Sequence, residues 1–226
     1  MDLVLEQAQP LDRGRQAAPQ IYEQLRQAII TLELPPGSPL SRAALMDVFG
    51  VSQTPIREAL IRLVDENLVD VFAQHKTRVS PIDLFHARET HLLRRSIEIE
   101  VVQVLSLAED KSFARPLEWD LELQRTALAE GNLAPYLKSS LNFHKALFEQ
   151  AGVSSLWTLV RSRSGHIDRI RRMDPPDPAT NVAEHIEILN AIREGEAVKA
   201  QELMRAHIGR AFANLEGIRE RWPQYF

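Results

Sequence analysis

The chain has 226 residues, with 27 Lys and Arg, 31 Asp and Glu, and no Cys. Its length suits one or two domains, and its composition is that of a soluble globular protein. The absence of Cys excludes disulfides, Cys-ligated zinc, iron–sulfur clusters and a thiol nucleophile. The formal net charge of −4 at first sight speaks against nucleic acid as a partner.

No signal for export or membrane insertion is found. The first residues lack a basic stretch followed by an apolar core, and no apolar run approaches the ~20 residues that span a bilayer. We therefore expect a cytoplasmic protein without a membrane partner.

Residues 1–18 are polar and irregular, and we expect a flexible arm there. A helix is predicted from Pro19 onward, because apolar residues then recur at three- and four-residue spacing. The prolines and glycine of Leu34-Pro35-Pro36-Gly37 end this helix.

Two short helices and a hairpin are predicted next. Ser41 is expected to cap a helix that Gly50 ends, and Ser52 to cap a second helix with Pro55 in its first turn. Residues 68–72 and 77–79 alternate apolar and polar side chains around Gln74-His75-Lys76, which indicates a hairpin. This order predicts a winged helix-turn-helix domain over residues 19–80.

The remainder of the chain carries almost no strand signal. Helical stripes are predicted over 84–108, 117–130, 135–151, 154–173, 180–194 and 196–218. We therefore predict an all-helical bundle over residues 83–219. The expected fold class is mainly α, with an N-terminal winged helix-turn-helix and a C-terminal α bundle.

The start of the second short helix offers side chains that read DNA. In a helix-turn-helix the N-terminal residues of the second helix face base edges in the major groove. Gln binds adenine bidentately, Arg binds guanine, and hydroxyls reach phosphates or bases. The candidates are Ser52, Gln53, Thr54 and Arg57. The alternative, in which Ser52 only caps the helix and Arg57 pairs with a carboxylate, stays open on spacing alone.

Residues 21–69, IYEQLRQAIITLELPPGSPLSRAALMDVFGVSQTPIREALIRLVDENLV, resemble the DNA-binding domain of the GntR family of bacterial transcription regulators. The resemblance implies that Gln53, Thr54 and Arg57 touch the operator and that Arg62 lies near the DNA backbone. Family members usually have a glutamate where this chain has Arg42, so Arg42 is expected to contact phosphate. The wing tip lacks the usual glycine, and we expect His75 or Lys76 to lead it into the minor groove.

The distribution of charge removes the objection to DNA. Residues 1–80 carry eight Lys and Arg against ten Asp and Glu, and the remainder carries 19 against 21. Neither part is basic as a whole. However, five of the eight cations fall in the helix-turn-helix and wing, and affinity depends on the charges in the footprint. Since one helix-turn-helix reads one half-site, a homodimer on double-stranded operator DNA is expected.

Three histidines of the second domain fall on apolar helical stripes and are expected to point into the bundle. These are His144, which shares its stripe with Leu137 and Leu141, together with His185 and His207. A shared divalent metal would satisfy all three, but the pattern alone favours separate core histidines bonded to carbonyls or carboxylates. None of the tight zinc spacings is present.

Four stretches of this half, RRSIEIEVV, FHKALFEQAGV, EHIEILNAIREGE and AQELMRAHI, resemble the all-helical effector-binding (FCD) domain of the FadR-type branch of the GntR family. In metal-binding members an aspartate and three histidines surround a divalent ion. The resemblance assigns the histidine positions to His144, His185 and His207, whereas Ser140 replaces the aspartate. Three histidines with water or an effector carboxylate would still suit zinc or a nickel-like ion.

Arg94 is the candidate for binding an effector carboxylate, because the family has an arginine there and a guanidinium forms a planar fork. The alternative is a surface ion pair between Arg94 and Glu98. Arg163 and His166 share an apolar face and are also expected to reach the effector cavity. His86, His91 and the run 169–172 are expected at helix ends or on the surface.

These features together predict a ligand-responsive transcription regulator that senses a small carboxylic acid and controls a metabolic operon. Such families contain more repressors than activators, so a repressor is expected. A small acid would bias one of two dimer geometries. Two alternatives remain at this stage: a DNA-binding regulator without effector or metal, and an enzyme that activates water at a histidine-bound metal. No general base beside the histidines favours the enzyme.

Overall fold

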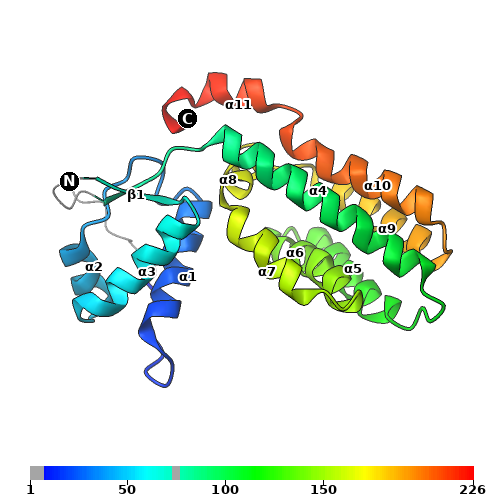
Figure 1. The fold of residues 1–226 in the computed structure, drawn as a ribbon, viewed down its shortest axis with the longest axis horizontal. Helices are drawn as coiled ribbons and strands as arrows, with labels where there is room; N and C mark the ends of the chain where they lie inside the picture. Colours follow the sequence, from blue (N-terminus) through cyan, green and yellow to red (C-terminus); the bar gives the residue numbers. More distant parts are fainter. Residues whose placement is uncertain (1–7, 73–76) are drawn as a thin grey trace. The chain divides into compact units, whose positions relative to one another are not determined.

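The computed structural model of the protein describes residues 8–72 and 77–226 (Figure 1). The chain divides into two compact units. The first unit comprises the described part of Met1–Arg88 together with Ser162–Asp174 and Asn214–Phe226, and the second comprises Glu89–Arg161 and Pro175–Ala213. No helix in the described ranges is long and apolar enough to cross a membrane.

The first unit contains a winged helix-turn-helix, as predicted. Its helices are α1 (Ala17–Ile30), α2 (Arg42–Phe49) and α3 (Gln53–Asp65). The strands β1 (Val69–Val71) and β2 (Thr77–Val79) pair antiparallel with Val69 opposite Val79. One apolar core joins all five elements.

Local capping fixes the turn between α2 and α3. The Ser41 Oγ accepts a hydrogen bond from the Ala44 N–H at 3.4 Å, which begins α2. Gly50 ends that helix at a φ of +62°, a left-handed conformation that favours glycine. Ser52 lies at the N-cap of α3, but its side chain makes no capping bond. Both predicted helix starts are therefore confirmed, and the Ser52 hydroxyl is left available at the surface.

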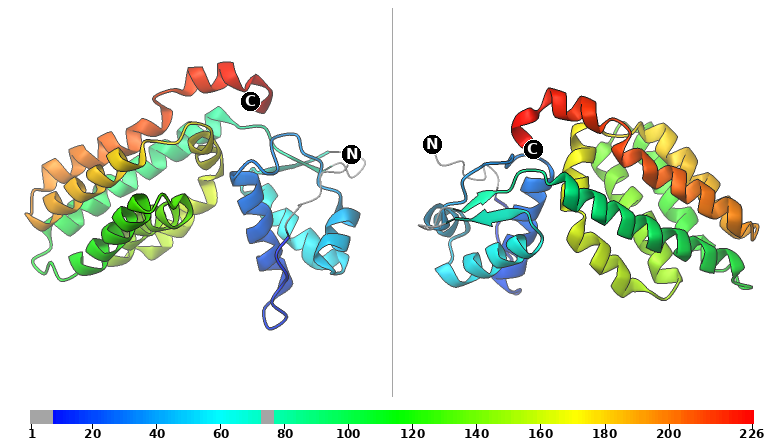
Figure 2. Two further views of the ribbon diagram at one scale, coloured as in Figure 1. Left: turned by 180° about the vertical axis from the view of Figure 1, so that it is seen from behind. Right: turned by 45° about the horizontal axis from the view of Figure 1, so that its top comes forward.

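The second unit is a helical bundle, which confirms the mainly α fold (Figure 2). Helix α4 (Leu84–Leu107) carries residues of both units, and α7 (Ser154–Arg163) also reaches the boundary. The other bundle helices are α5 (Ala114–Ala129), α6 (Leu133–Gln150), α9 (Pro178–Arg193) and α10 (Ala197–Gly209). Apolar side chains from α4, α5, α6, α9 and α10 form one continuous core.

Two predicted helices are each divided in the structure. The stretch 154–173 forms α7 and then α8 (Gly165–Met173), with a break at Ser164. The stretch 196–218 forms α10, the short 3-10 helix η2 (Arg210–Phe212) and α11 (Leu215–Arg221), and a second 3-10 helix, η3 (Pro223–Tyr225), follows. The predicted contiguous bundle over 83–219 also differs from the observed division, because α8 and α11 belong to the first unit.

The close approach of α8 to the winged helix explains why α8 belongs there. A Cβ atom added to Gly165 would lie 2.6 Å from the Leu68 Cδ2, and Leu68 is fully buried at the start of the hairpin. Helix α8 also packs on α1 and α11 within this unit. Glycine at the first position of α8 therefore permits a contact that any larger residue would obstruct.

Arg169 of α8 is fully buried, which corrects the expectation that the run 169–172 is solvated. Its Nη1 donates to the Ser80 carbonyl at 2.7 Å, and its Nη2 donates to the Pro81 carbonyl at 3.3 Å. Burial lowers the pKa of Arg169 to about 10, so the guanidinium stays charged at neutral pH. The segment between wing and α4 is thus held by a buried cation.

Candidate functional site

The residues predicted to read DNA lie at the exposed start of α3. Ser52, Gln53, Thr54 and Arg57 are all exposed, and Arg57 forms no ion pair with any residue in the described ranges. The alternative in which Arg57 is paired with a carboxylate therefore finds no support there. The exposed N-terminus of α3 also directs backbone N–H groups outward, which suits a phosphate.

The other predicted DNA contacts lie in different surroundings. Arg62 stacks on Tyr22, with its Cζ 3.8 Å from the ring centroid. Tyr22 donates to Glu66, which also accepts from Arg26 at 2.8 Å. Burial, with a contribution from Glu66, raises the pKa of Tyr22 to about 12, so the hydroxyl keeps its proton. Arg62 is thus held by its stacking on Tyr22.

Arg42 is half-buried at the first position of α2. Its Nε has no hydrogen-bond partner among the residues that the structure describes. His75 and Lys76 lie outside the described residues. Contact of these side chains with DNA stays a prediction.

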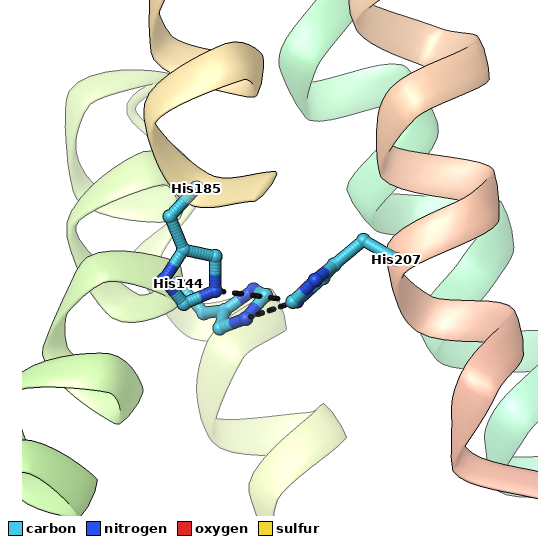
Figure 3. Close-up of side chains that lie close together, drawn as sticks. All are labelled: His144, His185 and His207. Carbon is cyan, nitrogen blue, oxygen red and sulfur yellow. Dashed lines mark hydrogen bonds between the residues drawn. The ribbon is translucent and has the colours of Figure 1, made fainter. Parts of the chain in front are cut away.

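The three histidines of the second unit meet at one point, and all are buried (Figure 3). His144 comes from α6, His185 from α9 and His207 from α10. The Nε2 atom of His207 lies 3.2 Å from the Nε2 of His185 and 3.2 Å from the Nε2 of His144. Sequence reasoning placed each histidine on an inward face, and the structure brings all three together.

The Nδ1 atom of each histidine, which points away from the centre of the trio, forms a hydrogen bond that orients the ring. The Nδ1 of His144 lies 2.7 Å from a Glu98 oxygen, and that of His207 lies 2.7 Å from a Glu184 oxygen. The Nδ1 of His185 lies 2.9 Å from the Gln124 Oε1. These oxygens accept hydrogen bonds, so each Nδ1 carries the proton and each Nε2 of a neutral ring presents its lone pair to the centre.

Three converging lone pairs suit a divalent cation. Nitrogen ligands lie ~2.0–2.1 Å from zinc, and in tetrahedral geometry they are then about 3.3 Å apart. The observed Nε2 separations of 3.2 Å match that value. The Nδ1 partners are also of the kind that orient metal-binding histidines in proteins. The donor set therefore fits a metal.

Glu98 and Glu184, the two carboxylates that orient histidines, each form an ion pair with an arginine. The Arg94 Nε donates to the Glu98 Oε1 at 2.5 Å, and Arg210 donates to Glu184. Burial would raise the pKa of Glu98, but Arg94 and His144 outweigh it and hold that pKa well below the usual range. The Arg94–Glu98 pair expected as a surface alternative does form, but it is buried and connects Arg94 to His144.

Ser140 lies where the aspartate of the family pattern is expected. It is buried on α6 one turn before His144, and its Oγ accepts from the Asn181 Nδ2 at 3.3 Å. Asn181 lies on α9, one turn before His185. No carboxylate therefore occupies the aspartate position.

Arg163 and His166 do not belong to the unit that holds the three histidines. His166 is buried in the first unit, where its Nδ1 accepts from the Asp83 N–H at 3.0 Å and from the Arg169 Nη2 at 2.9 Å. His86, expected at a helix end or on the surface, lies in the first turn of α4 but is buried, with its ring 4.9 Å from that of His166. These contacts give His166 a structural role in the first unit.

Sequence reasoning missed Glu98, Gln124 and Glu184 as the groups that orient the histidines. Glu98 is named only as an ion-pair partner of Arg94, and Glu184 directly precedes His185 in the sequence. Both carboxylates lie in stretches that resemble the FCD domain, which is the signal that could have found them. No local pattern marks Gln124, because its contact with His185 joins α5 and α9.

Comparisons with known proteins cover both halves of the chain. Residues 17–79 match the family model for "Bacterial regulatory proteins, gntR family", and residues 89–210 match that for the FCD domain. An HTH-type transcriptional regulator in an unstable DNA locus of Streptomyces ambofaciens is 35% identical over 94% of this chain and 91% of that protein. The HTH-type transcriptional repressor RspR of Escherichia coli K12 is 27% identical over 92% of each chain.

Solved structures share the fold. McbR/YncC of Escherichia coli superimposes with a TM-score of 0.73 at 19% identity, over 92% of this chain and 99% of that one. A GntR transcriptional regulator from Rhodococcus sp. RHA1 gives a TM-score of 0.72 at 22% identity, over 88% of this chain and 97% of that one. The two family models together match most of the chain, and the chain belongs to the GntR family of bacterial transcription regulators with a C-terminal FCD domain.

Proposed function

We propose that this regulator is a homodimeric operator-binding repressor that releases or rearranges on DNA when its FCD domain binds a small carboxylic acid at a metal held by His144, His185 and His207. The observation that carries the proposal is the convergence of three Nε2 atoms, each oriented through its Nδ1 atom. Relatives named as repressors support that sign of regulation.

A bound divalent metal would supply a positive centre that attracts an anionic oxygen ligand. The protein groups around the site would not neutralise the positive charge of the metal. Glu98 and Glu184 are each paired with an arginine, and an imidazole that binds a metal does so as a neutral ring. Because Ser140 takes the place of a carboxylate, the anion must come from the effector or solvent.

Arg94 is suited to hold the far side of such an anion. Its bond to Glu98 uses Nε, and its terminal Nη atoms form no hydrogen bond to a residue in the described ranges. The side chain is 10% exposed, so an ion pair formed there is little screened by solvent. One guanidinium thus orients His144 through Glu98 and offers its Nη edge to a carboxylate.

A second copy of the chain is the expected occupant of an apolar stripe on α6. Leu133, Leu137 and Leu141 recur every four residues and are 56%, 53% and 41% exposed. Leu137 and Leu141 were expected to share the inward face of His144, and the structure instead exposes them. Exposed leucines at this spacing suit a helix-to-helix contact between subunits.

The metal is tested with protein purified without a histidine tag. We expect elemental analysis to find about one zinc or nickel-like ion per chain, and chelation to lower the melting temperature. His185→Ala is expected to abolish both the metal content and the response to chelator. His91→Ala, which removes a half-buried histidine outside the trio, is the control and is expected to retain both. Metal-free protein that melts identically with and without chelator refutes the metal.

The effector is tested by operator release, with the operator selected from random DNA duplexes. A panel of small acids is expected to weaken operator binding by the wild type and by Arg95→Ala, but not by Arg94→Ala. Arg94→Lys keeps a cation beside Glu98 and is expected to fold while binding the acid more weakly. If Arg94→Ala responds like the wild type, Arg94 does not bind the effector. If no acid acts on any variant, the protein is an effector-independent regulator.

A further inference from the structure

A second buried polar pair, Ser140 and Asn181, lies next to the histidine trio. Ser140 precedes His144 by one turn of α6, and Asn181 precedes His185 by one turn of α9. Residues four apart lie on the same face of a helix, so the pair is on the faces that carry the two histidines. The bond from the Asn181 Nδ2 to the Ser140 Oγ, 3.3 Å long, joins the two helices there.

The pair has unused hydrogen-bonding capacity. Asn181 is 1% exposed, and its Oδ1 has no hydrogen-bond partner among the residues the structure describes. Buried carbonyl oxygens in folded proteins are almost always satisfied, because an unsatisfied one costs free energy. Ser140 is 8% exposed, and its oxygen accepts from Asn181, so its hydroxyl proton remains to be donated elsewhere.

The two side chains together offer an unpaired acceptor, a hydroxyl donor and no charge. This combination complements a hydroxyl group, which also donates once and accepts. A carboxylate at position 140 would offer acceptors only. The pair therefore differs in kind from the aspartate that the family pattern places there, and it suits a neutral polar group of a ligand.

We propose that Ser140 and Asn181 form a hydroxyl-binding subsite, so that the effector is a hydroxycarboxylic acid and not an unsubstituted one. This inference rests on the proposed function, which places the carboxylate of the effector at the trio and Arg94. The Asn181 Oδ1 accepts from the effector hydroxyl, and Ser140 donates to it. A site built around a hydroxyl rejects the analogue that lacks it, because the buried protein groups are then unpaired.

The test compares matched acids that differ by one hydroxyl. Glycolate and acetate, lactate and propionate, 3-hydroxybutyrate and butyrate, and malate and succinate are titrated calorimetrically into the zinc-loaded full-length protein. In at least one pair the hydroxy acid is expected to bind about tenfold or more tightly than its partner. Asn181→Leu, which fills a similar volume without polar atoms, is expected to reduce that ratio to near one.

A matched control separates the subsite from general effects. Asn190→Leu makes the same substitution at an exposed position of α9 and is expected to keep the full preference. This comparison also removes the part of the preference that comes from chelation by the hydroxy acid itself, since chelation is common to all variants. If Asn181→Leu does not fold, Ser140→Ala takes its place and is expected to reduce the ratio as well.

The outcomes distinguish a failure of the hydroxyl subsite from a failure of the proposed acid sensing. If hydroxy and plain acids bind the wild type equally, the subsite is refuted while acid sensing stands. If the preference is unchanged in both Asn181→Leu and Ser140→Ala, the hydroxyl is read elsewhere and the assignment to these residues is refuted. If no acid of any pair binds, the proposed function itself fails.

Discussion

The His166 side chain provides a sharp test of the packing in the first unit. Its Nδ1 accepts two hydrogen bonds, from the Asp83 N–H and from the Arg169 Nη2, and an imidazole can accept at that atom only while it is unprotonated there. Burial lowers the pKa of His166 to about 3, and the charges of Arg169 and His86 add to this effect. Asp83 acts in the opposite direction but is outweighed.

The sign of the pH effect follows from these values. In the unfolded chain the histidine has its ordinary pKa of about 6.5, so acid protonates the unfolded state first. The contribution of His166 to stability is complete above pH 6.5 and is lost progressively as the pH falls toward 3. At pH 5, about 1.5 units below the unfolded pKa, the loss is about 2 kcal/mol at roughly 1.4 kcal/mol per unit.

The perturbation that isolates this effect is His166→Asn. The Asn Oδ1 can replace the Nδ1 as an acceptor for Asp83 and Arg169, and asparagine does not titrate in this range. Urea unfolding of the full chain is measured for wild type and variant at pH 7.5 and pH 5. The wild type is expected to be the more stable at pH 7.5, and the difference is expected to shift by about 2 kcal/mol in favour of the variant at pH 5.

His91→Asn serves as the control, because His91 is only half-buried and its burial lowers its pKa in the same direction. Its shift between the two pH values is expected to be the smaller. If the difference between wild type and His166→Asn is the same at both pH values, His166 is not the buried neutral acceptor described above, and the reasoning fails.

Two further substitutions test the reading helix and the close contact of α8. Gln53→Ala is expected to weaken operator binding by about 1–3 kcal/mol and to relax specificity at one base pair. Glu58→Ala, on the same helix, is the control and is not expected to weaken binding. Equal effects of the two substitutions in a fluorescence anisotropy titration would contradict base reading by Gln53. Gly165→Ala is expected to destabilise the protein by about 1–3 kcal/mol in urea, because its Cβ would overlap the buried side chain of Leu68. Gly209→Ala, where no atom lies within 4 Å of the added Cβ, is the control and is expected to be neutral or slightly stabilising.

Much of the fold follows from periodicity and turn residues. The winged helix, the capping by Ser41, the left-handed Gly50 and the inward direction of the three histidines are all encoded locally, in short windows of sequence. Local patterns of this kind decide which face of a helix is buried.

The same patterns do not decide which neighbour covers a face. An apolar stripe runs through both α7 and α8, so the break at Ser164 and the return of α8 to the first unit leave no local signal. Arg169 is predicted at a helix end or on the surface, whereas it is buried and its partners are main-chain carbonyls, which no side-chain pattern marks. The exposed Leu137 shows the converse, since periodicity alone cannot distinguish a core face from a face that awaits a partner.

The buried Arg169 limits how this protein can be taken apart. It donates to the carbonyls of Ser80 and Pro81, while the Ile82 N–H donates to the Tyr225 carbonyl at 2.7 Å. A chimera that fuses residues 1–80 to the sensor of another regulator would discard α8 and the C-terminal tail together with these bonds. Transferring the DNA-binding unit to another protein therefore requires three separate segments of the chain. A domain boundary placed at a single point in the sequence does not separate the two units.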